Sequence, residues 1–100
     1  MPFQVTQFPG AAAQIRSLAR AAAAKGLAQG FVEAVEKIQT HLESHPAEWG
    51  DPEYNLIHAG GRVCHGIESG LVVRFALYEK KQAVCIIDIR PLPDSRFGES

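Results

Sequence analysis

The stretch GLVVRFALYEKKQAVCIIDIR, residues 70–90, holds two apolar segments on either side of a charged turn. Segments 71–78 and 83–89 are rich in β-branched and aromatic residues, and this composition favours two antiparallel strands. Arg74 interrupts the first segment. Because a guanidinium keeps its charge in a protein, Arg74 must reach water, an acidic partner or an anionic ligand.

The apolar residues of these two strands predict how the strands pair. Two sets of alternate residues are apolar: Leu71, Val73, Phe75 and Leu77 in the first strand, and Ala83, Cys85, Ile87 and Ile89 in the second. Placing both sets toward one core requires an odd-length loop and sets Arg74 opposite Asp88 on the other face. An even loop would put Asp88 in the core, where an unpaired carboxylate costs several kcal/mol. We therefore predict the odd loop.

The rest of the chain predicts an α+β domain. Residues 3–8 alternate in polarity and end at a Pro-Gly pair, as in a short strand. Residues 11–25 are rich in alanine, and residues 27–44 repeat apolar positions every three or four residues, so we expect an antiparallel helical hairpin. Segments 54–58 and 62–67 extend the later strands into an antiparallel β-meander. The predicted order is N-terminal strand, helical hairpin, then meander, with the helices on one sheet face.

Length and composition bound the number of domains. The chain has 100 residues, of which 46% are hydrophobic and 21% charged, as expected for a single globular domain. We assign residues 1–90 to this domain and residues 91–100, which are rich in proline, to an irregular tail. Residues 45–54 hold prolines, glycine and aspartate and are predicted to form a loop whose Trp49 covers one end of the core.

Charge and hydropathy narrow the classes of function. The net charge is -1 and the sequence pI is about 6.4, whereas a dedicated nucleic-acid binder carries a marked positive excess. The apolar stretches are much shorter than the roughly 20 residues needed to cross a bilayer, and MPFQVTQFPG lacks the features of a secretory signal. We therefore expect a cytoplasmic protein that makes no contact with the membrane.

The cysteine and histidine residues are candidates for metal or redox sites. Cys64 and Cys85 are expected on strands that flank a central strand, roughly 10 Å apart, which is too far for a disulfide. His41 and His45 have the i, i+4 spacing that can hold zinc or nickel, but Glu48 is the only nearby third ligand. Two histidines at a helix C-terminus also suit the helix dipole without metal. We favour that interpretation and expect no metal and no cofactor.

The order of motifs resembles one known family. HLESHP precedes a WGDP loop, and GRVCHGIESGLVVRFALYEKKQAVCIIDIR follows with an arginine on each of two neighbouring strands. Over residues 3–90 this pattern resembles the RelE/ParE superfamily of small bacterial toxins. The resemblance implies an antitoxin partner that wraps the toxin. It also implies one of two targets: mRNA in the ribosomal A site, which RelE-like members cleave, or DNA gyrase, which ParE-like members poison.

The resemblance also suggests roles for individual residues. Arg74 matches the family arginine of the penultimate strand, and Arg62 more loosely matches the arginine one strand earlier. The connection between them is longer here, and the basic segment after the last strand is replaced by Arg90-Pro91-Leu92-Pro93. The acidic net charge also departs from the RNA-cleaving members. These departures argue against nuclease activity.

Three functions follow as hypotheses. The leading one is a RelE/ParE-like toxin-type domain that binds a protein partner through Arg74, Asp88 and Tyr78. The alternative is a ribosome-dependent mRNA endoribonuclease, in which Arg74 clamps phosphate and a second cation and an acid or base come from Arg62, Arg90, His65 and His58. The third is a stand-alone α+β domain that forms a homodimer.

Overall fold

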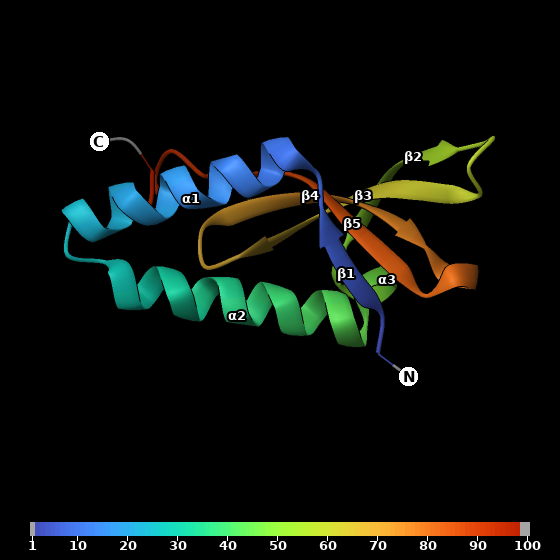
Figure 1. The fold of residues 1–100 in the computed structure, drawn as a ribbon, viewed down its shortest axis with the longest axis horizontal. Coiled ribbons are helices and arrows are strands. Elements are labelled where there is room, and N and C mark those ends of the chain that lie inside the picture. The colour runs from blue at the N-terminus through green and yellow to red at the C-terminus, as the bar shows by residue number, and fades with distance from the viewer. Residues whose placement is uncertain (1, 99–100) are drawn as a thin grey trace.

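The computed structural model describes residues 2–98 and has the predicted α+β order (Figure 1). Its elements are β1 (Gln4–Gln7), α1 (Pro9–Ala24), α2 (Ala28–Ser44), α3 (Pro46–Trp49), β2 (Asp51–Leu56), β3 (Gly61–Glu68), β4 (Leu71–Tyr78), a 3-10 turn (Glu79–Lys81) and β5 (Ala83–Pro91). The N-terminal strand, the helical hairpin and the meander are all confirmed. No helix within residues 2–98 combines the length and apolar character needed to cross a bilayer.

The five strands form one mixed sheet in the order β1-β5-β4-β3-β2. Strands β2 to β5 pair antiparallel as a meander, and β1 pairs parallel to β5. The chain between β1 and β5 includes the helical hairpin and strands β2 to β4, so it is long enough for the crossover that a parallel pair requires. Strand β4 therefore lies at the centre of the sheet, with β3 and β5 on its two sides.

Local sequence signals set the ends of the helices. Helix α1 begins at Pro9, whose missing N–H is no loss in the first turn. It ends before Gly26, which has a φ of 75° and adopts the left-handed conformation that glycine tolerates. Helix α2 ends before Pro46, because the proline ring disfavours helical backbone at His45. These short breaks turn the two helices back on each other.

Both helices pack on one face of the sheet. The buried residues of α2 are Phe31, Ala34, Ile38 and Leu42, and those of α1 are Ala11 and Ala22. They share one core with the inward residues of β4, which are Leu71, Val73, Phe75 and Leu77. Burying each large side chain of this core contributes about 1.5–3 kcal/mol to stability.

The predicted odd loop between β4 and β5 is wrong. Tyr78 pairs with Ala83, so the loop has four residues, and Gln82 in it adopts a left-handed φ of 49°. A β-bulge then restores the register, because Phe75 pairs with Ile86 while Arg74 pairs with Asp88.

The bulge changes which β5 residues face the core. Val84, Ile86 and Ile89 are buried there. Of the predicted inward set, only Ile89 was correct. Ala83 and Cys85 lie on the other face, and Ile87 is the extra residue of the bulge. Asp88 stays out of the core, as predicted, although the loop is even.

The segment before the meander is more regular than predicted. Residues 46–49 form the short helix α3 and β2 begins at Asp51, whereas we expected a loop up to residue 54. Pro46 suits the first turn of a helix, and Pro52 is tolerated because β2 is an edge strand. Trp49 packs against the core, as expected, with its ring stacked 5.9 Å from that of Phe75.

The segment after β5 also contributes to the core. Residues 92–98 form turns without a helix or strand, but Phe97 is buried against Phe31 with ring centroids 5.5 Å apart. Lys25 Nζ donates a 2.7 Å hydrogen bond to the carbonyl oxygen of Gly98. This segment therefore closes the end of the helical hairpin where α1 meets α2.

Candidate functional site

The sheet face opposite the helices is the main exposed surface with functional side chains. The outward residues of β4 are Val72, Arg74, Ala76 and Tyr78, which alternate with the core residues of the same strand. Because α1 and α2 pack on the other side, no helix within residues 2–98 covers this surface, which we call the open face.

A row of four ionisable residues crosses the open face. Strand register places Asp51 opposite His65, His65 opposite Arg74, and Arg74 opposite Asp88. The four residues come from β2, β3, β4 and β5 in turn. Directly opposed side chains in a sheet lie close enough to interact, and ion-pair contacts join Asp51 to His65 and Arg74 to Asp88.

Arg74 and Asp88 form the shortest contact of the row. Arg74 Nη2 lies 2.9 Å from Asp88 Oδ2, and the other oxygen of this carboxylate lies 4.0 Å from Nε of Arg90. The Asp88 side chain is only 18% exposed, and each of its two oxygens has a guanidinium group as a neighbour. Within the described residues, the buried Nε of Arg74 has no hydrogen-bond partner.

His65 has acidic neighbours as well. Its Nδ1 lies 3.4 Å from a carboxylate oxygen of Glu53, and its Nε2 lies 4.0 Å from one of Asp51. A β-bulge in β2 between Pro52 and Tyr54 interrupts the regular pairing beside these residues. Glu53 was not among the predicted site residues, because the bulge that brings it close is invisible in the sequence.

The remaining predicted residues divide between the two faces. Arg90 and Tyr78 lie on the open face, and the Tyr78 ring covers Gly61, where an added Cβ would come within 2.6 Å. Arg62 pairs with the inward-facing Leu77 and forms an ion pair with Glu79, so it lies on the opposite face from Arg74. His58 lies between β2 and β3, in the tip of that hairpin.

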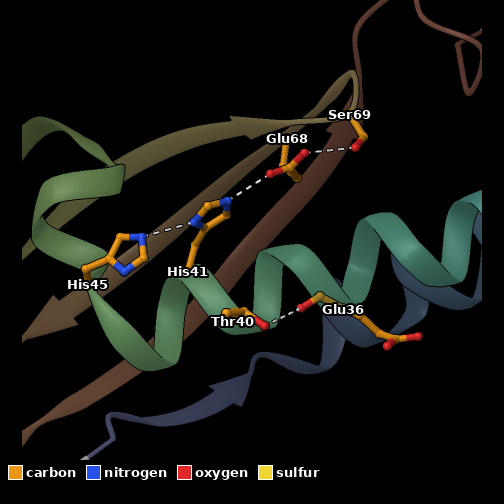
Figure 2. Close-up of polar contacts among 6 residues, drawn as sticks. All are labelled: Glu36, Thr40, His41, His45, Glu68 and Ser69. Atoms are coloured by element: carbon orange, nitrogen blue, oxygen red, sulfur yellow. Dashed lines mark hydrogen bonds and ion pairs between the residues drawn. The ribbon is translucent and has the colours of Figure 1, made fainter.

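A second polar cluster lies at the C-terminal end of α2 (Figure 2). His41 Nε2 is 2.8 Å from Oε1 of Glu68, and Ser69 Oγ donates a 2.9 Å hydrogen bond to the other carboxylate oxygen. His41 Nδ1 is 3.2 Å from Nε2 of His45. The His41 ring also stacks on Trp49, with centroids 4.8 Å apart and planes 8° apart.

These contacts perturb the acid–base behaviour of Glu68. Burial raises the pKa of this carboxyl, but hydrogen bonds from His41 and Ser69 and the nearby positive charge of Lys37 outweigh burial. The pKa of Glu68 is therefore below its ordinary value of 4.5. Glu68 ends β3 and His41 lies in α2, so this pair links the sheet to the helix.

Sequence reasoning identified His41 and His45 but missed Glu68. The two residues of the ion pair are 27 positions apart, and neither lies in a motif that points to the other. Beside them, Glu33, Glu36, Lys37, Thr40, His41 and Glu68 line an open groove of about 590 Å³. Within residues 2–98, no group of three or more His, Cys, Asp or Glu side chains is arranged to hold a metal ion.

The two cysteines are separated as predicted. Cys64 in β3 pairs with the inward-facing Phe75, whereas Cys85 in β5 pairs with the outward-facing Ala76. They thus flank β4 and also lie on opposite faces, and both are free thiols. Burial raises the pKa of the Cys64 thiol, and the nearby Arg62 only partly offsets this effect.

Comparison of the chain with family models, with curated proteins and with solved structures found no match.

Proposed function

We propose that this chain is a RelE/ParE-like toxin-type domain that acts by binding a protein partner, such as an antitoxin, through the open face. The α+β order, with two helices followed by a five-stranded mixed sheet, is consistent with a RelE-like fold. One observation favours a protein partner over a nucleic-acid partner. Arg74, the central cation of the open face, is already paired with Asp88.

The charges of the open face support this choice. Phosphate recognition draws on uncompensated positive charge, because bound cations must replace the counterions of the nucleic acid. On the open face, a phosphate would have to displace Asp88 from Arg74 and would meet Asp51 and Glu53 beside His65. A protein surface with both acidic and basic groups complements such a row without this conflict.

The alternative function is a ribosome-dependent mRNA endoribonuclease, and one observation favours it. His65 lies directly opposite Arg74 on the neighbouring strand, so a general acid or base and a phosphate clamp share one face. Arg90 lies on this face as well. Arg62, the second arginine of the family pattern, lies on the other face and would not join them.

Partner binding can be tested with the small proteins encoded on either side of this gene. Each would be co-expressed with the chain, and the dissociation constant of any complex would be measured for wild type, Arg74→Ala and Arg20→Ala. Arg20 is exposed on α1, away from the open face, so its variant is a matched control for the loss of one arginine. We expect Arg74→Ala to weaken the complex by about tenfold or more, as loss of a central interface arginine does, and Arg20→Ala to leave it unchanged.

Two further assays separate the alternatives. Purified chain would be added to translating ribosomes to detect mRNA cleavage, and to DNA gyrase to detect loss of supercoiling. Cleavage that Arg74→Ala abolishes without unfolding the protein would replace the binding proposal with the nuclease. A stable homodimer that binds neither neighbouring protein would instead favour a stand-alone dimerising domain.

A further inference from the structure

The two histidines at the end of α2 face each other through one ring nitrogen of each (Figure 2). His41 Nδ1 and His45 Nε2 are 3.2 Å apart. When both rings are neutral, either one nitrogen donates a proton to the other or the two lone pairs face each other. The second arrangement is stable only when a cation lies between the two nitrogens, because the lone pairs repel.

Glu68 determines which arrangement His41 can adopt. An ionised carboxylate only accepts hydrogen bonds, so the hydrogen of neutral His41 lies on Nε2, which is 2.8 Å from Glu68. The lone pair of His41 is then on Nδ1 and points toward His45 Nε2, which donates a hydrogen bond to it when protonated and can share a cation with it when deprotonated. A carboxylate bonded to the far nitrogen of an imidazole is the usual outer partner of a metal-binding histidine, and it raises the basicity of the ligating nitrogen.

The surroundings hold the His41 ring in this orientation. The parallel stack with Trp49 sets the plane of the ring, and Ser69 fixes Glu68 through its second oxygen. His45 is exposed at the end of α2, so an ion from solvent can reach its nitrogen. The His41 side of the site is thus ordered by the fold itself and does not depend on a bound ion.

We propose that His41 Nδ1 and His45 Nε2 bind one divalent transition-metal ion of the zinc or nickel type, with Glu68 as the orienting carboxylate. Two zinc–nitrogen bonds of about 2.0–2.1 Å at a tetrahedral angle place their nitrogens roughly 3.3 Å apart. The observed separation of 3.2 Å matches this value. Water completes the coordination, since the described residues supply no third ligand.

The two histidines are the pair that the sequence suggests, but the carboxylate beside them is a different one. From the sequence, the candidate third ligand was Glu48, which is three residues after His45. In the structure, the carboxylate that contacts His41 is Glu68 of β3, which binds the nitrogen facing away from the metal position. The proposal rests on this cluster alone, so it stands or falls independently of partner binding at the open face.

The test is a calorimetric titration of tag-free protein with Zn²⁺. We expect one ion per chain, loss of binding in His45→Ala and His41→Ala, and affinity lowered about 10- to 100-fold in Glu68→Gln. His58→Ala, which removes an imidazole from the β2–β3 turn, is the matched control and should bind as wild type does. Trp49 fluorescence supplies a second readout, because the only tryptophan of the chain stacks on His41.

Several results would overturn the proposal. Absence of saturable Zn²⁺ binding would do so directly. So would binding that survives His45→Ala, since this exposed residue can be replaced with little effect on folding. Loss of binding in His65→Ala with retention in His45→Ala would assign the ion to His65, Asp51 and Glu53 on the open face.

Discussion

Arg74 and Asp88 face each other across β4 and β5, with Nη2 of the arginine 2.9 Å from Oδ2 of the aspartate. They meet because Ile87 is an extra residue in β5, between Ile86, which pairs with Phe75, and Asp88. Without this bulge, the four-residue loop would pair Asp88 with Val73 and direct the carboxylate into the core. The bulge therefore keeps the Asp88 carboxylate out of the core and places it in the charged row of the open face.

Deletion of Ile87 should preserve the pairing of Arg74 with Asp88. The deletion makes the β4–β5 ladder regular, with Ile86 still opposite Phe75 and Ile89 still opposite Val73. We expect a cooperative unfolding transition and a native-like amide spectrum by NMR. Deletion of Ala76 in β4 is the control, because β3 has no extra residue to absorb the shift. Equal loss of structure in both deletions would refute this account of the bulge.

The Arg74–Asp88 pair should contribute little to stability. The side chains of Arg74 and Asp88 are 35% and 18% exposed, and the pair lies on the open face of the sheet, where surface ion pairs contribute about 0–1 kcal/mol. Urea unfolding of Arg74→Ala, Asp88→Asn and the double variant gives the coupling energy of the pair. We expect no more than about 1 kcal/mol. A coupling energy several times larger would mean that the pair stabilises the fold. Weaker partner binding by Arg74→Ala could then result from lost stability and would not locate the binding surface.

Substitution of Gly66 should destabilise the protein. An added Cβ at this position would lie 2.6 Å from the Trp49 ring, so Gly66→Ala forces the indole away from β3. Overpacking of this kind costs about 1–3 kcal/mol. In α1, Gly10→Ala meets no atom within 4 Å and should be neutral or stabilising, which makes it the matched control. Thermal unfolding and Trp49 fluorescence measure both effects.

Glu68 should contribute stability that depends on pH. Its folded pKa is below the unfolded value, so its contribution is present above pH 4.5 and is lost as the pH falls through the folded pKa. Urea unfolding at several pH values should show wild type more stable than Glu68→Gln at pH 7, with the difference shrinking below pH 4.5. Glu36→Gln, at an exposed residue of α2, should show no such trend. A difference that grows on acidification would have the wrong sign.

The two thiols should differ in reactivity in the folded protein. Cys85 is partly exposed, whereas Cys64 is buried and burial raises its pKa, which lowers the fraction of reactive thiolate. A thiol reagent should therefore modify Cys85 first, with mass spectrometry after proteolysis identifying the site. After denaturation both cysteines should react without prior reduction. A chain two mass units lighter than calculated would reveal a disulfide and contradict the strand order.

Several features could be predicted because they depend on neighbours in the sequence. The alternation of residues 71–78 predicts a strand, and the spacing of three and four residues in 27–44 predicts a helix, since each pattern reflects the geometry of one element. The end of α1 just before Gly26 follows from local backbone chemistry in the same way. The α+β order could therefore be read before any contact between elements was known.

The route by which Arg74 meets Asp88 could not be predicted in the same way. Ile86 and Ile87 are adjacent and equally apolar, so nothing in the sequence says which of them faces the core. The fold resolves this choice through the four-residue loop and the bulge. The predicted pair was correct, but the predicted loop length was wrong. The cost of burying a carboxylate requires only that Asp88 face away from the core, and either an odd loop or an even loop with a bulge satisfies this requirement.

The sequence by itself determined the main strands and the helical hairpin, their order and the exclusion of Asp88 from the core, because these depend on periodicity and on the cost of burying charge. It did not reveal the short helix α3. Only the tertiary structure brought Glu68 to His41 across 27 positions and Phe97 to Phe31. It also placed Arg62 and Arg74 on opposite faces. Such relationships arise when separate elements pack, and side-chain contacts between elements leave no local pattern in the chain.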